Sequence, residues 1–401
     1  MEELWLSWSQ LKRELIDKEV VFFGAGEWAE KTLRKIDKEP LCILDNNEMM
    51  QDTVYAGVNV VSVETVFEIE EEFIILITTG SYKSVVEQLN SMGFEESEEF
   101  YCSPVLYNNK VEEEIKNNDQ TLLFSCPEIP QPESDNVGGG LYTFNTRTNN
   151  LEKHFSGKLH QIVKTDEFYY VVDEFEGVRV FDKEINLVST FKGLPGSIMH
   201  GLALDEENNK LFIANTGRDS ISLMDASDGS HQEEIYISYK NKEGEADRHH
   251  INDLCFYKGN LYISMFSFSG LWREGVYDGG VAKFSLEDQE IYNYIMEDMW
   301  MPHSIDFING ELILLDSMRG DAYKTSNKKL VNINGFARGI DYDGKYYYIG
   351  QSEHRYFDRL KGVSNNISLN CGIHLYDNLT SVSRFYSFEK LTNIHSIVVK
   401  D

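Results

Sequence analysis

The feature that most constrains the fold of this chain is a short segment that recurs six times. Each copy opens with a polar residue, a spacer and an Ile or Leu, and the complete copies continue through an Asp, Asn or Gly turn into an apolar strand. The copies start 35 to 57 residues apart, at His160, His200, Asn252, His303, Arg338 and His395. This spacing, with about four strands in each interval, is typical of the blades of a β-propeller.

The sixth copy is cut short at Asp401 and leaves room for one strand. Three further strand-like segments, TLLFSC, GGLYTFN and LEKHF, lie at the other end of the repeat region, between residues 121 and 155. Pairing the last strand with these three completes a sixth blade and removes exposed sheet edges. The sequence therefore predicts a six-bladed β-propeller over residues 121–401, with a split last blade.

A different pattern fills the start of the chain. The segment EVVFFGAGEWAEKTLRKI predicts a strand that turns through Gly24 and Gly26 into a helix, and the next strand ends at Asp45. Glycines at this turn let a phosphate approach the backbone, and an acidic residue about 20 positions later can bind a ribose. We expect a small Rossmann-like α/β domain with a parallel sheet over residues 1–107, so the fold class is α/β plus all-β. Gly24, Gly26 and Asp45 are its candidate nucleotide or nucleotide-sugar site, although the same glycine turn could serve packing alone.

Residues 108–120, NNKVEEEIKNNDQ, are polar and charged, and they are interpreted as a linker or a short exposed helix. The preceding run FGAGEWAEKTL…CILDNN…FIILITTG resembles the small Rossmann-like domain that accompanies sugar acyltransferases and methyltransferases of surface-polysaccharide pathways. That resemblance implies a supporting role with sugar-nucleotide substrates.

Charge and cysteine content limit the partners. The net charge of −30 repels phosphate backbones and anionic lipids, so nucleic acid is not an expected partner. No signal peptide and no apolar run long enough for a membrane span is present, so membrane insertion is not expected either. The five cysteines lack metal-binding spacing and are interpreted as reduced thiols in a cytoplasmic protein.

The inner strand of each blade lines the central channel, so the polar residues that open the repeats should converge at one channel mouth. The candidate catalytic residues are His160, His200, His303, His395 and Arg338, and His200 and His303 are the candidate ligands of a divalent metal ion. The candidate substrate-binding residues near this mouth are His250, Asn252, Asp173, Asn215, Asp316, Arg319, Arg355 and Trp272. Two long insertions, at 265–280 and 352–371, should overhang the mouth. The alternative is that these histidines only bind neighbouring backbone.

The stretch YYIGQSEHRYFDRLKG…CGIHLYD…NIHSIVV resembles an uncharacterised propeller-like family of bacterial proteins, over roughly residues 137–401, and this implies a fold more than an activity. Six-bladed propellers that resemble this one include lactonases and lyases. The first hypothesis is thus an enzyme with metal-assisted lyase or hydrolase chemistry on a small polar or anionic substrate, which could be linked to a saccharide. The alternative is a non-catalytic saccharide- or peptide-binding or scaffold protein in surface-polysaccharide biosynthesis, with a protein partner docked on the N-terminal domain.

Overall fold

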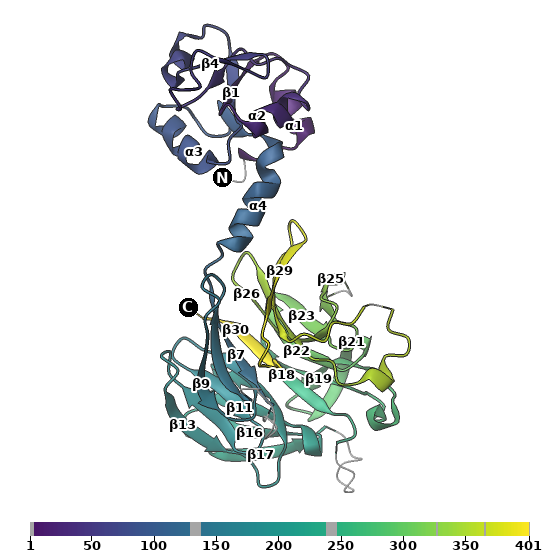
Figure 1. Cartoon of the computed structure of the whole chain (residues 1–401). Helices are drawn as coiled ribbons and strands as arrows, with labels where there is room; N and C mark the ends of the chain where they lie inside the picture. The colour runs from purple at the N-terminus through teal and green to yellow at the C-terminus, as the bar shows by residue number, and fades with distance from the viewer. Residues whose placement is uncertain (1–3, 129–137, 238–246, 326–327, 365, 401) are drawn as a thin grey trace. The chain divides into compact units, whose positions relative to one another are not determined.

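A computed structural model describes residues 4–128, 138–237, 247–325, 328–364 and 366–400. The chain divides into two compact units, and the boundary between them in the sequence lies between Asn117 and Asn118 (Figure 1). Each unit is described below by itself.

The first unit contains a six-stranded sheet in the order β3-β4-β2-β1-β5-β6. The strands are β1 (Glu19–Phe23), β2 (Ile43–Leu44), β3 (Val54–Tyr55), β4 (Val58–Val61), β5 (Phe73–Ile77) and β6 (Phe100–Cys102). All pairs are parallel except the β3–β4 hairpin. In β1, Val21 and Phe23 pack into one apolar cluster and Val20 and Phe22 into another. The sheet is therefore buried on both faces, as parallel sheets usually are.

Few helices accompany this sheet: α1 (Trp8–Glu14), α2 (Glu27–Leu33), α3 (Tyr82–Ser91) and α4 (Tyr107–Lys116), with the short 3-10 helices η2 (Val63–Glu68) and η3 (Pro104–Leu106). The connection from β2 to β4 runs through a hairpin strand, and η2 precedes β5. The parallel sheet is therefore established, whereas a full Rossmann-like arrangement stays a prediction. Most of the segment expected as a linker is helix α4, whose Val111 and Ile115 are buried, so this segment is neither extended nor fully exposed.

The second unit is a six-bladed β-propeller, as the repeats predict. Its six sheets have four antiparallel strands each. Five of them follow the chain order: β10 (Leu159–Lys164) to β13 (Leu187–Lys192), β14 (Met199–Asp205) to β17 (His231–Tyr236), β18 (Ile251–Tyr257) to β21 (Glu290–Met299), β22 (Pro302–Ile308) to β25 (Lys328–Asn332), and β26 (Phe336–Tyr342) to β29 (Val382–Ser387). The intermediate strands are β11 (Tyr169–Asp173), β12 (Gly177–Phe181), β15 (Lys210–Asn215), β16 (Ser220–Asp225), β19 (Asn260–Met265), β20 (Gly279–Ser285), β23 (Glu311–Asp316), β24 (Asp321–Lys324), β27 (Tyr347–Ser352) and β28 (Gly372–Asp377).

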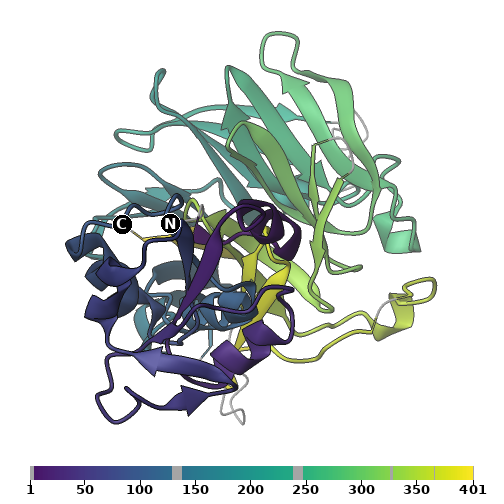
Figure 2. The same ribbon diagram turned by 90° about the horizontal axis from the view of Figure 1, so that it is seen from above.

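The sixth blade combines the two ends of the propeller chain (Figures 1 and 2). It has the order β30 (Ser396–Val399), β7 (Thr121–Cys126), β8 (Gly140–Asn145) and β9 (Leu151–Ser156). Strand β30 pairs with β7 in the register Ser396 to Ser125 and Val399 to Leu122. The predicted split blade is thus confirmed, and the inner strands β10, β14, β18, β22, β26 and β30 contact their neighbours around a closed ring.

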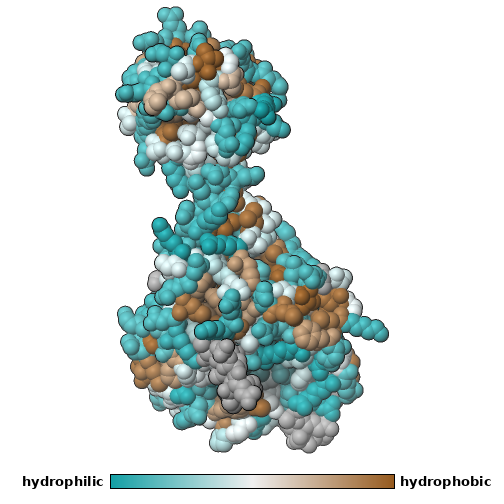
Figure 3. Space-filling view, in the orientation of Figure 1, coloured by the Kyte–Doolittle hydropathy of each residue, from teal (hydrophilic) through white to brown (hydrophobic). Residues whose placement is uncertain are grey.

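The surface carries both hydrophobic and hydrophilic residues. On the face shown in Figure 3, hydrophobic residues form separate patches between hydrophilic ones. No helix in the described part of the chain is long and apolar enough to cross a membrane.

Core packing between blades gives a first testable result. Leu202 and Ile305 occupy the third position of their repeats and are 0 % and 2 % exposed. Replacing either residue by Ala is expected to lower the free energy of unfolding by about 2–5 kcal/mol, because the lost methyl groups leave a cavity. Urea unfolding of the full chain measures the loss. Leu379→Ala is the matched control, since Leu379 is 80 % exposed, and equal stability of the Leu202 and Leu379 variants would contradict this packing.

Candidate functional site

A repeated β-bulge positions the first residues of the blades. In five inner strands the ladder shifts register at the start of the repeat: Leu159/Ile162, Met199/Gly201, Ile251/Leu254, His303/Asp306 and Ala337/Ile340. A bulge breaks the alternation of side chains and re-aims the residues within it. The opening residues of these five blades lie at or within the shifts, whereas His395 directly precedes β30, which pairs with β7 in regular register.

The predicted histidines come together. The ring centroids of His160 and His200 are 4.2 Å apart, those of His160 and His395 are 4.6 Å apart, and those of His303 and His395 are 5.7 Å apart. His250 lies beside them, 5.6 Å from His200. We call these five residues the histidine cluster.

Glu174 and Asn252 determine which ring nitrogen carries the proton in His160 and in His200. The carboxylate of Glu174 lies 2.9 Å from Nε2 of His160 and also accepts from Lys158 at 2.7 Å. A carboxylate that accepts at Nε2 places the proton there, so Nδ1 of His160 keeps its lone pair, and this buried atom has no partner among the described residues. His200 bonds through Nδ1 to Oδ1 of Asn252, at 3.1 Å.

A buried carboxylate stands beside His395. Oδ1 of Asp253 is 3.3 Å from Nε2 of His395, close enough for an ion pair but without hydrogen-bond geometry. Oδ2 of Asp253 accepts from the backbone of Ser304 and from Asn252, at 2.8 and 2.9 Å. These two donors hold the carboxylate next to the His395 ring.

The expected open mouth is wrong in one respect, because most of these histidines are buried. His160, His303 and His395 are 5 %, 1 % and 2 % exposed. The physical reason is an apolar cluster beside them, formed by Phe266, Met301, Met318 and Phe336 with Trp272, Tyr277, Trp300, Tyr356 and Leu360. The rings of Phe266 and Phe336 lie 5.3 and 5.8 Å from that of His303.

Both long insertions contribute to this apolar cluster. Trp272 and Tyr277 come from the first insertion, and Tyr356 and Leu360 come from the second. Arg359 joins the insertions by donating a hydrogen bond of 2.5 Å to the hydroxyl of Tyr277. The insertions therefore pack against each other and against the residues beside the histidine cluster.

Burial sets the charge state of the cluster. Desolvation lowers the pKa of His160, His200 and His303 well below the usual value, and it also lowers the pKa of His395. The charge of Arg338 acts in the same direction on all four. These imidazoles are therefore neutral at pH 7 and can act as ligands or bases.

One group has the spacing of a metal site. Single ligand atoms of His160, Glu174 and His200 all lie within 4.8 Å of one another. The sequence instead pairs His200 with His303, whose Nδ1 is engaged by Ser317 and by the carbonyl of Met301, at 2.7 and 2.9 Å. Glu174 and Asp253 were not among the predicted residues, and the only signal for Glu174 was its position after Asp173 at the end of β11.

The predicted substrate-binding residues separate into two groups. Asn252 and His250 contact His200, and the Trp272 ring lies 4.6 Å from His250. The others have partners of their own: Asp173 with Arg179, Asn215 with Ser222, Asp316 with Arg319, and Arg355 with Glu128. Asp173, Asn215 and Asp316 end the second strand of their blades, one strand farther from the axis than the cluster.

The glycine turn of the first unit has a packing explanation. Gly24 has a φ of +109°, and a Cβ there would lie 2.8 Å from Cβ of Thr79, whereas a Cβ on Gly26 would meet open space. The side chain of Asp45 accepts from the backbone N–H of Ala25 at 2.7 Å, so it already binds an amide that a phosphate would use. Helix α2 also begins with the acidic Glu27. A nucleotide at Gly24, Gly26 and Asp45 therefore stays a prediction.

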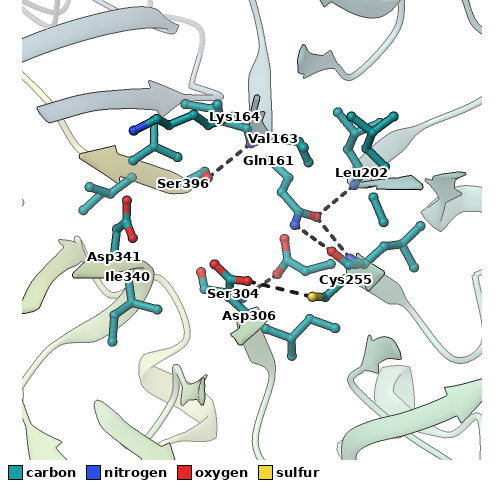
Figure 4. Close-up of a pocket in the computed structure, with 18 of the residues that line it drawn as sticks. Gln161, Val163, Lys164, Leu202, Cys255, Ser304, Asp306, Ile340, Asp341 and Ser396 are labelled. Atoms are coloured by element: carbon teal, nitrogen blue, oxygen red, sulfur yellow. Dashed lines mark hydrogen bonds between the residues drawn. The ribbon is translucent and has the colours of Figure 1, made fainter. Parts of the chain in front are cut away.

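The other end of the central channel holds a cavity of about 500 Å³, lined by all six inner strands (Figure 4). Its polar lining includes Lys164, Ser304, Asp306 and Asp341. Burial raises the pKa of Asp341 to about 6 and also raises that of Asp306. Asp253 lines this cavity as well, so it stands between the cavity and His395.

The model of the family described as Domain of unknown function (DUF4915) matches residues 178–399, more than half of the chain. The chain belongs to this family. The match begins in the second residue of β12 and extends to the end of β30, so it covers most of the propeller and most of the histidine cluster. No activity comes with the family description.

One solved structure of low sequence identity supports the fold, and the fold alone. A protein of unknown function from Bacteroides caccae is 13 % identical, with a TM-score of 0.51 over 71 % of this chain and 99 % of that one. A chain in the crystal structure of a nidogen/laminin complex is 12 % identical, with a TM-score of 0.49 over 71 % of this chain and 98 % of that one. No curated protein matches the chain.

Proposed function

We propose that the DUF4915 propeller of this chain is a metal-dependent enzyme that acts on a small polar or anionic substrate by lyase or hydrolase chemistry. The metal ion is a divalent transition metal bound by His160, His200 and Glu174. The observation that carries this proposal is the spacing of these three residues, since one ligand atom of each lies within 4.8 Å of the other two and both imidazoles are neutral at pH 7. On binding, the metal would replace the proton that Nε2 of His160 shares with Glu174.

The donor set suits such an ion. Neutral imidazole is a good ligand for zinc and similar metals, and a carboxylate can complete the set. Asn252 orients the ring of His200 through Nδ1 and leaves Nε2 free to coordinate. When bound, the metal would polarise a carbonyl group or activate a water molecule.

His395 is the proposed general acid–base residue. It is neutral at pH 7, its ring lies 4.6 Å from that of His160, and the Asp253 carboxylate beside Nε2 would stabilise the imidazolium after a proton is accepted. Asp253 acts through His395 and is therefore a positioning residue.

Metal content tests the proposal. We expect the purified full chain, incubated with Zn²⁺ or Mn²⁺ and dialysed, to hold about one ion, and the His160→Ala and His200→Ala variants to lose most of it, because each loses a ligand. Elemental analysis measures the ion. His374→Ala is the matched control, since this partly buried histidine on β28 bonds to Gln351 at 3.0 Å and is not in the cluster.

Two results would count against the enzyme. A metal-free wild-type chain would favour the non-catalytic binding or scaffold role. Equal metal content in the His160→Ala variant and the wild type would place the ion elsewhere.

A further inference from the structure

Arg338 is a cation beside the histidine cluster, and it has no close counter-ion. Its Nη1 donates to Oδ1 of Asn393 at 3.0 Å, and this is its one hydrogen bond to the residues that the structure describes. Within the same residues, no carboxylate lies at ion-pair distance from it. Its Nε is inaccessible to solvent and has no partner. Arg338 is partly buried, and a charge that has lost part of its water is costly unless a partner offsets it.

The guanidinium is held in place. Asn393 also accepts from the hydroxyl of Ser352 at 3.0 Å, and the Cζ of Arg338 lies 4.8 Å from the ring centre of Phe336. With Nη1 bound to Asn393, the edge formed by Nε and Nη2 has no hydrogen-bond partner among the described residues, and an oxyanion that enters there would satisfy the buried Nε. That edge is the fork that binds two oxygens of a carboxylate or phosphate group.

We propose that Arg338 binds an oxyanion group of the substrate, either a carboxylate or a phosphate, through its Nε/Nη2 edge. This inference rests on the proposed function, because it names the substrate class of the same site. Burial lowers the pKa of Arg338 to about 10, so the guanidinium still carries its charge at pH 7. A bound oxyanion would supply a close counter-ion, whereas Asp253 and Glu128 act on Arg338 only from beyond ion-pair distance.

The position of Arg338 would place a bound anion beside His395, the proposed acid–base residue. Arg338 lies close enough to His303 and His395 for its charge to lower the pKa of both rings. Both nitrogens of His395 lack a hydrogen-bond partner in the described part of the chain. An oxyanion at Arg338 thus anchors the substrate beside the proposed acid–base residue and partly cancels the Arg338 charge, which adds to the effect of burial on the pKa of His395.

Titration calorimetry of the full chain tests the proposal. The metal is first removed with a chelator, so that the anion cannot bind to the metal instead. Inorganic phosphate and malonate are titrated separately, in a buffer without other oxyanions. We expect at least one of them to bind to the wild type, and Arg338→Gln to weaken this binding about tenfold to a hundredfold, because a charge-assisted bidentate contact is lost. Binding of phosphate alone identifies a phosphorylated substrate, and binding of malonate alone identifies a carboxylic acid.

Arg179→Gln is the matched control, because Arg179 is also partly buried in the propeller but already pairs with Asp173 at 3.2 Å. It is expected to bind the anion as the wild type does. Arg338→Lys keeps the charge and removes the fork, so it should bind weakly, and it replaces the Gln variant if that variant fails to melt cooperatively. Wild-type affinity in either Arg338 variant, or no binding of both anions to the wild type, would overturn the proposal. Metal content of the Arg338 variants is measured in parallel, and it should equal that of the wild type. Loss of the anion with the metal retained is the expected result. A wild type that holds the metal but binds neither anion would overturn this inference alone, and a wild type that binds the anion but holds no metal would overturn the proposed function alone.

Discussion

A chain that begins at Asn118 is expected to fold into a cooperatively melting propeller, whereas a chain that begins at Gly138 is expected not to fold. The second chain lacks β7, which pairs with β30 on one side and β8 on the other. Phe124 of β7 is fully buried and stacks on Tyr142 and Phe388, at 5.4 and 5.6 Å. Its loss leaves two unpaired strand edges and an empty place in the core, which a closed ring cannot tolerate.

Circular dichroism during urea unfolding measures the result for both chains. The longer chain keeps Asn118, whose side chain accepts hydrogen bonds from Thr146 and Tyr348 at 2.6 and 3.2 Å. A synthetic peptide covering residues 118–128 is the control for the shorter chain, because it can restore the missing strand and should restore cooperative unfolding. A soluble chain without β7 that unfolds cooperatively on its own would show that blade closure does not stabilise the propeller.

The propeller could be predicted from the sequence because its blades are encoded locally. Each inner strand carries the same short pattern followed by a turn, as in HSIDFINGELILLD, and strand alternation and turn chemistry depend on neighbouring residues. The split blade followed from counting strands. The convergence of the opening residues also followed, because a residue at one repeat position points to the axis in every blade.

The burial of these residues could not be predicted in the same way. It depends on contacts between insertions far apart in the chain, such as Arg359 with Tyr277. Glu174 and Asp253 were missed for the same reason, since their importance comes from the rings that they meet rather than from a motif. In the first unit, the bond from Ala25 to Asp45 gives this acidic residue a local role that the fingerprint alone does not reveal.

Acid is expected to destabilise the propeller steeply below about pH 6.5. Burial holds the pKa of His160, His200, His303 and His395 below the value of about 6.5 that an unfolded histidine has. Between the folded and unfolded pKa values the unfolded chain binds more protons, so the stability that these residues contribute is present above pH 6.5 and is lost as the pH falls. Each such histidine adds up to about 1.4 kcal/mol per pH unit to the slope.

Several carboxylates oppose this trend, because burial raises their pKa values: Glu174, Asp306, Asp316, Asp341 and Glu353. The pKa rises to about 7 for Asp316 and to about 6 for Asp341. The stability that these protonated carboxyl groups contribute is lost as the pH rises toward those values, which offsets part of the histidine effect at pH 5–6.5. The difference between variants removes the contribution of the carboxylates that do not contact His160; Glu174, which does, is the exception. Urea unfolding of the chelator-treated chain at pH 5, 6 and 7 should give a slope for His160→Gln that is about 1 kcal/mol per pH unit shallower than that of the wild type. His231→Gln, at an exposed position on β17, should keep the wild-type slope. A His160→Gln slope equal to that of the wild type would mean that His160 is as readily protonated in the folded chain as in the unfolded one, and the neutral imidazole required for metal binding would then be absent at moderately acid pH.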